Sequence, residues 1–142
     1  MTANKLKLEI QAFSKNVTLA RAAAASFLTL YDPNIAELTD IKTAVSEAVT
    51  NAVIHGYAEN GDIVTMEISA ENGEISIEIS DKGVGIENVK KAMKPLFTTK
   101  PETERSGLGF TVMESFMDTI EVISSTGEGT TVRMKKKLGA AE

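Results

Sequence analysis

The stretch Ile41-Lys-Thr-Ala-Val-Ser-Glu-Ala-Val-Thr-Asn-Ala-Val-Ile-His-Gly-Tyr57 predicts the helix around which the rest of the chain is arranged. At about 100° per residue, its apolar side chains fall on one arc that would face a core. Glu47 and Asn51 are four residues apart, so they lie on one side of this helix, beside the apolar arc. They are either two solvated polar groups or a pair of hard oxygen donors suited to Mg²⁺ and a phosphate. The arc consists of Ile41, Val45, Ala48, Val49 and Ala52.

Composition excludes several classes of protein. The 142 residues are 42% hydrophobic and 25% charged, which predicts one globular domain over residues 1–142. No run of about 18 apolar residues and no apolar leader are present, so we expect a cytoplasmic protein with no membrane span. Zero cysteines exclude thiolate chemistry, and one histidine excludes a multi-histidine zinc site. The net charge of −5 argues against direct nucleic-acid binding.

The segment before the central helix predicts a strand and a first helix. Residues 5–13 alternate apolar and polar, as in a half-buried strand. Ser14 is a candidate N-cap for the helix that follows and that ends at residues 32–34. Pro33 suits the first turn of the central helix, and Gly56 suits a left-handed cap at its end.

A hairpin follows the central helix. Residues 63–70 and 74–81 read as strands joined at Asn72-Gly73, a strong type I′ turn signal. The alternation puts Asp81 on the buried side, where a carboxylate needs a partner. Gly83 and Gly85 follow it and would let the backbone approach a flat ligand, so that Asp81 accepts from an amine such as that of adenine. The same Asp-x-Gly-x-Gly pattern also occurs in ordinary turns.

The last third of the chain contains an irregular segment and a second glycine-rich turn. Residues 87–97 predict a short helix, and residues 97–106 lack periodicity, as is common in a functional lid. Glycines in Ser106-Gly-Leu-Gly-Phe110 open a helix whose N-terminus would favour an anion, or they form a plain turn. Lys100 and Arg105 upstream are candidate phosphate contacts or surface charges. Strands are predicted over 120–124 and 130–136, and Lys135–Lys137 are expected to be solvated.

Taken together, these motifs resemble those of the GHKL superfamily, whose nucleotide-binding fold (the Bergerat fold) is shared by DNA gyrase, Hsp90, histidine kinases and MutL. The order is Glu47-x-x-x-Asn51, Asp81-x-Gly-x-Gly85, Gly107-x-Gly109 and Gly129-Thr130. The resemblance covers about residues 5 to 137. It implies an α/β (α+β) two-layer sandwich in which helices cover one face of a mixed sheet. ATP would lie between the layers, beneath a lid at about residues 86–106.

Within that superfamily the chain is most similar to the small serine kinases that act as anti-sigma factors, and among them to the anti-sigma F family of endospore-forming bacteria. Two stretches carry this resemblance: residues 45–57 and residues 95–110. It implies an ATP-dependent protein serine kinase that inhibits a sporulation sigma factor of the sigma F type. It would phosphorylate an anti-anti-sigma factor on serine and form a homodimer. The alternatives are a non-catalytic, ATP-gated sigma-binding module, the catalytic half of a histidine kinase, and a kinase for a stress-response sigma factor.

The resemblance also assigns roles to matching residues. Glu47 would be the general base on the substrate serine, Asn51 the Mg²⁺ ligand, and Asp81 the acceptor for the adenine amine of ATP or ADP. Arg105 would contact the γ-phosphate. The other nucleotide-binding residues would be Gly83 and Gly85 beside the base, Thr130 beside Asp81, the phosphate loop Gly107, Leu108, Gly109 and Phe110, and the lid residues Thr99, Lys100 and Ser106.

Two residues keep two interpretations. His55 continues the row of Glu47 and Asn51, so it either borders the ligand or caps the helix. Arg21 stands alone in an alanine-rich helix and either contacts the sigma factor or is solvated or paired.

Overall fold

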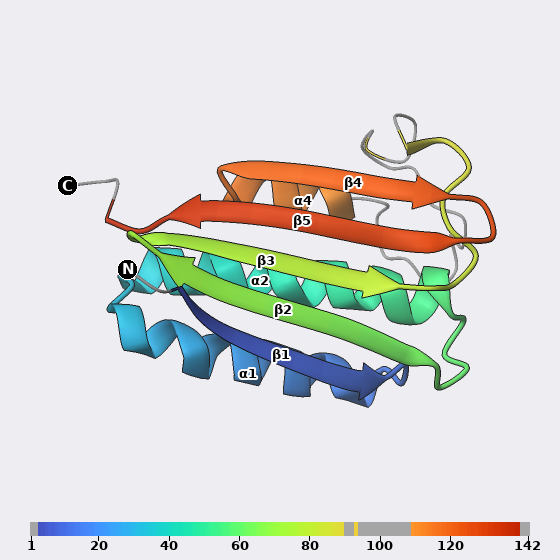
Figure 1. Ribbon diagram of the computed structural model, residues 1–142, viewed down its shortest axis with the longest axis horizontal. Coiled ribbons are helices and arrows are strands. Elements are labelled where there is room, and N and C mark those ends of the chain that lie inside the picture. The colour runs from blue at the N-terminus through green and yellow to red at the C-terminus, as the bar shows by residue number, and fades with distance from the viewer. Residues whose placement is uncertain (1–2, 90–92, 94–108, 140–142) are drawn as a thin grey trace.

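One five-stranded sheet with helices on one face makes up the part of the chain that the computed structural model describes, residues 3–89, 93 and 109–139 (Figure 1). The strands are β1 (Asn4–Gln11), β2 (Ile63–Glu71), β3 (Glu74–Asp81), β4 (Thr119–Ser125) and β5 (Gly129–Lys137). The helices are α1 (Lys15–Leu28), the 3₁₀ turn η1 (Thr29–Tyr31), α2 (Ile35–Thr50), the π-helical turn η2 (Asn51–Gly56) and α4 (Gly109–Phe116). Among the described residues no helix is long and apolar enough to cross a membrane.

The strand order is β1-β2-β3-β5-β4, and all four pairings are antiparallel. The two-layer sandwich is therefore confirmed, but the expected mixed sheet is wrong for the described strands. Two helices separate β1 from β2, so the chain returns in the opposite direction and the two strands pair antiparallel. β3 and β4 do run parallel to each other, but β5 lies between them and pairs antiparallel with both.

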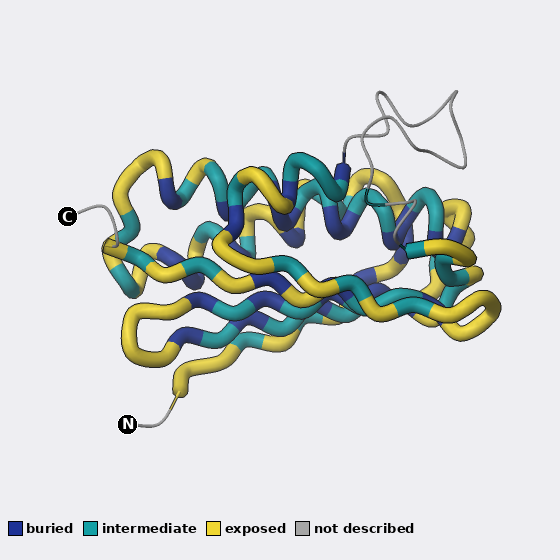
Figure 2. Tube along the Cα trace, turned by 90° about the horizontal axis from the view of Figure 1, so that it is seen from above, coloured by how far each residue is buried: buried dark blue, intermediate teal, exposed yellow. Residues whose placement is uncertain are grey.

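The core lies between the sheet and the helices, as Figure 2 shows by the buried positions along the inner side of each layer. The apolar arc predicted for the central helix is confirmed, because its five side chains, four on α2 and Ala52 on η2, are all buried. They face apolar residues of the sheet, where Ile75, Ile77 and Ile79 of β3 are also buried. The opposite face of the sheet carries no helix from the described part of the chain.

The ends of α1 and α2 differ from prediction in detail. Ser14 precedes α1 but makes no side-chain cap; its hydroxyl instead donates to the Glu59 carboxylate. The N-cap of α2 is Asn34, which accepts from the Glu37 N–H at 2.7 Å, while the Glu37 carboxylate accepts from the Asn34 N–H at 2.8 Å. This capping box starts the helix after Asn34, so Pro33 precedes the cap and the prediction that it lies in the first turn is wrong.

At its C-terminal end α2 widens into the π-turn η2, in which the Tyr57 N–H donates to the Ala52 carbonyl at 3.0 Å. The predicted left-handed conformation of Gly56 is wrong; the positive φ angles come later, at Ala58 and Glu59 (50° and 58°). Glycine is needed at position 56 for a different reason. A Cβ atom there would lie 2.8 Å from Cγ and Oδ1 of Asp81, which is closer than real Cβ atoms come.

The predicted hairpin turn is confirmed, and one of the three predicted solvated lysines is not. Asn72 and Gly73 both have positive φ, 53° and 80°, as a type I′ turn requires. The predicted helix over 87–97 lies mostly outside the described residues, although the Met93 N–H donates to the Val89 carbonyl at 3.0 Å. Most of the predicted lid also lies outside them. Lys136, which we expected to be solvated, has a side chain only 16% exposed.

Candidate functional site

The first half of the candidate site is formed where the N-terminus of α4 meets the last turn of α2 and the first residue of η2. Gly109, the first residue of α4, is buried against Glu47 and Asn51. A Cβ atom at Gly109 would lie 3.2 Å from Asn51 Nδ2 and 3.4 Å from Glu47 Oε2. The fold therefore brings the predicted pair Glu47 and Asn51 together with Gly109, which the sequence placed in a separate glycine-rich turn.

The N-terminus of α4 favours an anion, whereas the Glu47 carboxylate beside it favours a cation. The first backbone N–H groups of a helix lack intrahelical partners and carry a partial positive charge. The first turn of α4 contains no acidic side chain that would already use this charge. A phosphate at the N-terminus of α4 would therefore lie beside the carboxylate of Glu47 and the carboxamide of Asn51.

The donors at this junction also fit Mg²⁺. Glu47 and Asn51 offer hard oxygen atoms, and Mg²⁺ characteristically combines one or two protein ligands with phosphate oxygens and water. Among the described residues, no group of three or more His, Cys, Asp or Glu side chains could hold a metal ion without such help.

The second half of the site is the end of β3. Asp81 is 7% exposed, which confirms the burial predicted from the alternation of the strand. Burial raises the pKa of its carboxyl group, while hydrogen bonds from the backbone of Gly83 and Thr130 lower it by less. The Gly83 N–H donates to Asp81 Oδ1 at 2.9 Å. A buried carboxylate held in this way can accept a further hydrogen bond from the amino group of a flat ligand.

The loop after Asp81 is fastened to the rest of the fold through its backbone N–H groups. The Lys82 N–H donates to the Tyr57 hydroxyl at 2.6 Å, and that hydroxyl donates to the Ile63 carbonyl at 2.9 Å. The Val84 N–H donates to the Gly56 carbonyl at 3.0 Å. Tyr57 is buried, which raises the pKa of its phenol, so the hydroxyl keeps the proton that it donates.

Ser124 of β4 fastens the far end of the same loop. Its hydroxyl accepts from the Ile86 N–H at 2.7 Å and bonds the Gly129 carbonyl and the Thr130 hydroxyl at 2.9 and 2.8 Å. Sequence reasoning missed both Tyr57 and Ser124 as loop anchors. The position of Tyr57, a large side chain with a hydroxyl directly after a helix, could have indicated an anchoring role. A serine within a strand gives no such indication.

The glycines of the loop contact protein backbone. A Cβ atom at Gly83 would lie 2.0 Å from the Gly56 carbonyl oxygen, and one at Gly85 would lie 2.0 Å from the Ser125 carbonyl oxygen. Gly129, in β5, is equally close to backbone, because a Cβ atom there would lie 2.1 Å from the Asp81 carbonyl oxygen. These close approaches are sufficient reason for the glycines. That Gly83 and Gly85 also make room for a base stays a prediction.

The π-turn η2 connects the two halves of the site. Its first residue, Asn51, lies beside Gly109, and its last, Gly56, lies against the Asp81 carboxylate. Because a π-turn holds more residues per turn than an α-helix, the predicted row from Asn51 to His55 does not continue at α-helical spacing. Interruptions of this kind are frequent at functional sites. His55 lies within the turn and is half-buried.

The remaining predicted residues are placed as follows. Thr130 pairs with Asp81 across β5 and β3, and Phe110 is half-buried in α4. Arg21 is exposed on α1. Six predicted residues lie outside the described part of the chain: Thr99, Lys100, Arg105, Ser106, Gly107 and Leu108.

Comparison with known proteins identifies the family. Residues 10–136 match the family described as "Histidine kinase-like ATPase domain". The chain is 53% identical over 142 residues to the anti-sigma F factor of Clostridium acetobutylicum, covering 100% of this chain and 99% of that relative. It is 55% identical over 136 residues to the anti-sigma F factor of Clostridium perfringens, covering 95% and 97%.

A solved structure shares the fold. The RsbU and RsbW domains of a Mycobacterium tuberculosis protein superpose with a TM-score of 0.69 at 18% identity, over 95% of this chain and 32% of that one. The resemblance inferred from the motifs is thus confirmed: the chain belongs to the histidine kinase-like ATPase domain family and, within it, to the anti-sigma F factors.

Proposed function

We propose that this protein is an ATP-dependent protein serine kinase that binds and inhibits a sporulation sigma factor of the sigma F type in the cytoplasm. In this proposal it phosphorylates an anti-anti-sigma factor on serine and acts as a homodimer. The contact of Gly109 with Glu47 and Asn51 carries the enzymatic part, because it sets a helix N-terminus beside an acid and an amide. The names of the relatives, anti-sigma F factor, support the sigma partner.

The proposed mechanism assigns ATP to the space between the two halves of the site. The carboxylate of Asp81 accepts from the adenine amine, and the N-terminus of α4 receives the phosphates. The side-chain oxygen of Asn51 would hold Mg²⁺, which when bound neutralises phosphate charge. The residues proposed to complete the nucleotide site are His55, Gly83, Gly85, Thr99, Lys100, Arg105, Ser106, Gly107, Leu108, Phe110 and Thr130.

Glu47 is proposed as the general base. The oxygen of the substrate serine bonds to the γ-phosphorus, the bond from that phosphorus to the bridging oxygen of ADP breaks, and Glu47 takes the serine proton. Arg105 would stabilise charge on the γ-phosphate, and Arg21 would contribute to the sigma surface. Phosphoryl transfer depends mainly on positioning and charge neutralisation, which residues around a helix N-terminus can supply.

The proposal is tested by phosphotransfer from γ-labelled Mg-ATP to a purified anti-anti-sigma factor. We expect Glu47→Ala to lower the transfer rate by roughly 10²-fold or more, the usual contribution of a general base, while the dissociation constant for ADP changes by less than about threefold. Glu114→Ala removes the same charge from an exposed position of α4 and should transfer at the wild-type rate. Equal loss of transfer and ADP binding in Glu47→Ala contradicts the role of Glu47. Absence of label with the wild type, despite ATP binding, would indicate a nucleotide-gated binding module.

A further inference from the structure

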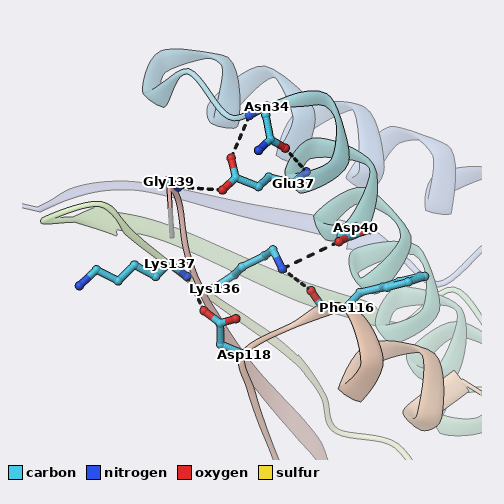
Figure 3. Close-up of polar contacts among 8 residues, drawn as sticks. All are labelled: Asn34, Glu37, Asp40, Phe116, Asp118, Lys136, Lys137 and Gly139. Carbon is cyan, nitrogen blue, oxygen red and sulfur yellow. Dashed lines mark hydrogen bonds and ion pairs between the residues drawn. The ribbon is translucent and has the colours of Figure 1, made fainter. Parts of the chain in front are cut away.

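Lys136 of β5 reaches from the sheet to two helices at the end of the fold opposite Asp81. Its ammonium donates to the carbonyl of Phe116, the last residue of α4, at 2.8 Å. Its Nζ also lies 3.9 Å from Oδ2 of Asp40 on α2 (Figure 3). Lys136 is therefore the place where β5, α4 and α2 are joined by one side chain.

The contact is suited to fixing the end of a helix. The last carbonyl groups of a helix have no intrahelical donor and carry a partial negative charge, so a cation there both donates and neutralises. With a side chain 16% exposed, the ammonium is shielded from much of the solvent that weakens surface ion pairs. Two neighbouring bonds support it: the Lys137 N–H donates to Asp118 Oδ2 at 2.7 Å, and the Asp118 N–H donates to the Lys135 carbonyl at 2.9 Å.

The other end of α4 belongs to the candidate site. α4 has eight residues and is therefore about 12 Å long. Gly109 at its N-terminus lies against Glu47 and Asn51, and Phe116 at its C-terminus is tied through Lys136 to Asp40. The first contact is made directly with α2 and η2, and the second runs to α2 through Lys136 of β5, so together they define how this short helix lies along α2.

We propose that Lys136 is a positioning residue, which holds α4 on α2 and thereby sets its phosphate-facing N-terminus against Glu47. This inference rests on the proposed kinase function. A shift of about 1 Å in the relative positions of reacting groups can cost on the order of 10²-fold in rate, so a contact at the far end of α4 can affect transfer without touching the nucleotide.

Three variants test the inference. Lys136→Met keeps the apolar stem and removes the ammonium. Lys136→Arg keeps a cation that can donate to Phe116 and Asp40. Lys135→Met is the matched control, because it removes the same charge from the neighbouring exposed residue of β5.

For each variant we would measure kcat and the KM for ATP in phosphotransfer, and amide hydrogen exchange of residues 109–116 without nucleotide. We expect Lys136→Met to lower kcat about tenfold or more with KM changed by less than about threefold, and to speed exchange in α4. Lys136→Arg should keep kcat and the exchange rate of α4 near their wild-type values, and Lys135→Met should match the wild type in both.

Unchanged exchange in Lys136→Met would overturn the inference, as would an equal loss of kcat in Lys135→Met. The inference would also be overturned if the fractional loss of kcat in Lys136→Met were no larger than the fraction of that variant that is unfolded under the assay conditions. If the wild type transfers no phosphate, the proposed function fails, and the exchange comparison still decides whether Lys136 holds α4.

Discussion

Asp81 places a carboxylate where little water reaches it, and this has consequences for both stability and binding. Burial raises its pKa above the ordinary value of 3.8. Such a group binds its proton more tightly in the folded than in the unfolded chain, so its contribution favours folding at low pH. That contribution is lost as the pH rises through the raised pKa, which is the cost of keeping an acceptor ready for a ligand.

We therefore expect Asp81→Asn to separate stability from binding. The free energy of unfolding of the wild type, minus that of the variant, should fall as the pH rises above 3.8, because only the wild type must bury a charge. ADP binding should weaken by roughly 10- to 150-fold, since the variant loses a charged acceptor worth about 1.5–3 kcal/mol. Urea unfolding across a pH series and calorimetric ADP titration measure the two effects.

A stability difference that is independent of pH would contradict the assigned burial of charge. Retained ADP affinity would contradict the adenine role. Asp62→Asn, at an exposed position in the loop before β2, is the control for the loss of one carboxylate.

Single residues also show what local sequence reasoning can and cannot reach. The burial of Asp81 was predictable because it follows from the alternation along one strand. The role of Gly56 was not, because the atoms that exclude a side chain there belong to Asp81, 25 residues away. A glycine near a helix end suggests a left-handed cap locally, and only the packed structure shows that it makes room for a carboxylate.

At the scale of elements, the β4–β5 hairpin holds the loop that leaves β3. Ser124 on this hairpin binds the Ile86 N–H, and the Gly127 N–H donates to the Val84 carbonyl at 2.7 Å. The loop between Asp81 and Ile86 is thus fixed from one side by η2 and from the other by the hairpin. The hairpin thereby helps to set the shape of the nucleotide site that we propose.

Ser124→Ala should loosen this loop without disrupting the sheet. The variant leaves the Ile86 N–H without its partner, so we expect a stability loss of about 1–2 kcal/mol. ADP affinity should fall about three- to tenfold, because the binding loop must then be ordered by the ligand. Ser125→Ala, the exposed next residue, is the control and should change neither quantity appreciably. Unaltered ADP affinity in Ser124→Ala would show that the hairpin does not shape the site.

Elements with a clear period were predicted correctly, and their pairing was predicted less well. The five strands, α1, α2 and α4 each follow from hydrophobic spacing within one segment. The insertion of β5 between β3 and β4 depends on contacts between segments, and this is why the sheet is antiparallel rather than mixed. The π-turn was missed because nothing in Asn51–Gly56 distinguishes it from a continuing α-helix.

At the scale of the whole molecule, Glu37 joins the start of α2 to the segment that follows β5. Its buried carboxylate accepts from the Asn34 N–H and, at 2.7 Å, from the Gly139 N–H, which is 102 residues further along. Figure 3 shows this contact beside that of Lys136, both at the N-terminal part of α2. The chain after β5 is therefore attached to the helix layer as well as to the sheet.

We expect Glu37→Gln to lower the free energy of unfolding by about 1–3 kcal/mol, because its single amide oxygen cannot satisfy both N–H groups as a carboxylate does. Chemical denaturation measures this loss, and ADP affinity should stay within about twofold of the wild type. Glu71→Gln, an exposed residue at the same end of the sheet, should leave stability unchanged. A loss of ADP affinity as large as the loss of stability would mean that the two ends of the fold are not energetically separate.

The direction of the strands has one practical consequence. β1 begins and β5 ends at the end of the sheet opposite Asp81 (Figure 1). With eight residues in β3 at about 3.4 Å each, that end of the sheet is roughly 25 Å from Asp81 and the candidate site. A fluorescent reporter or a surface tether joined before Asn4 or after Gly139 would thus leave the approach to the site clear, so partner exchange could be followed on the immobilised protein.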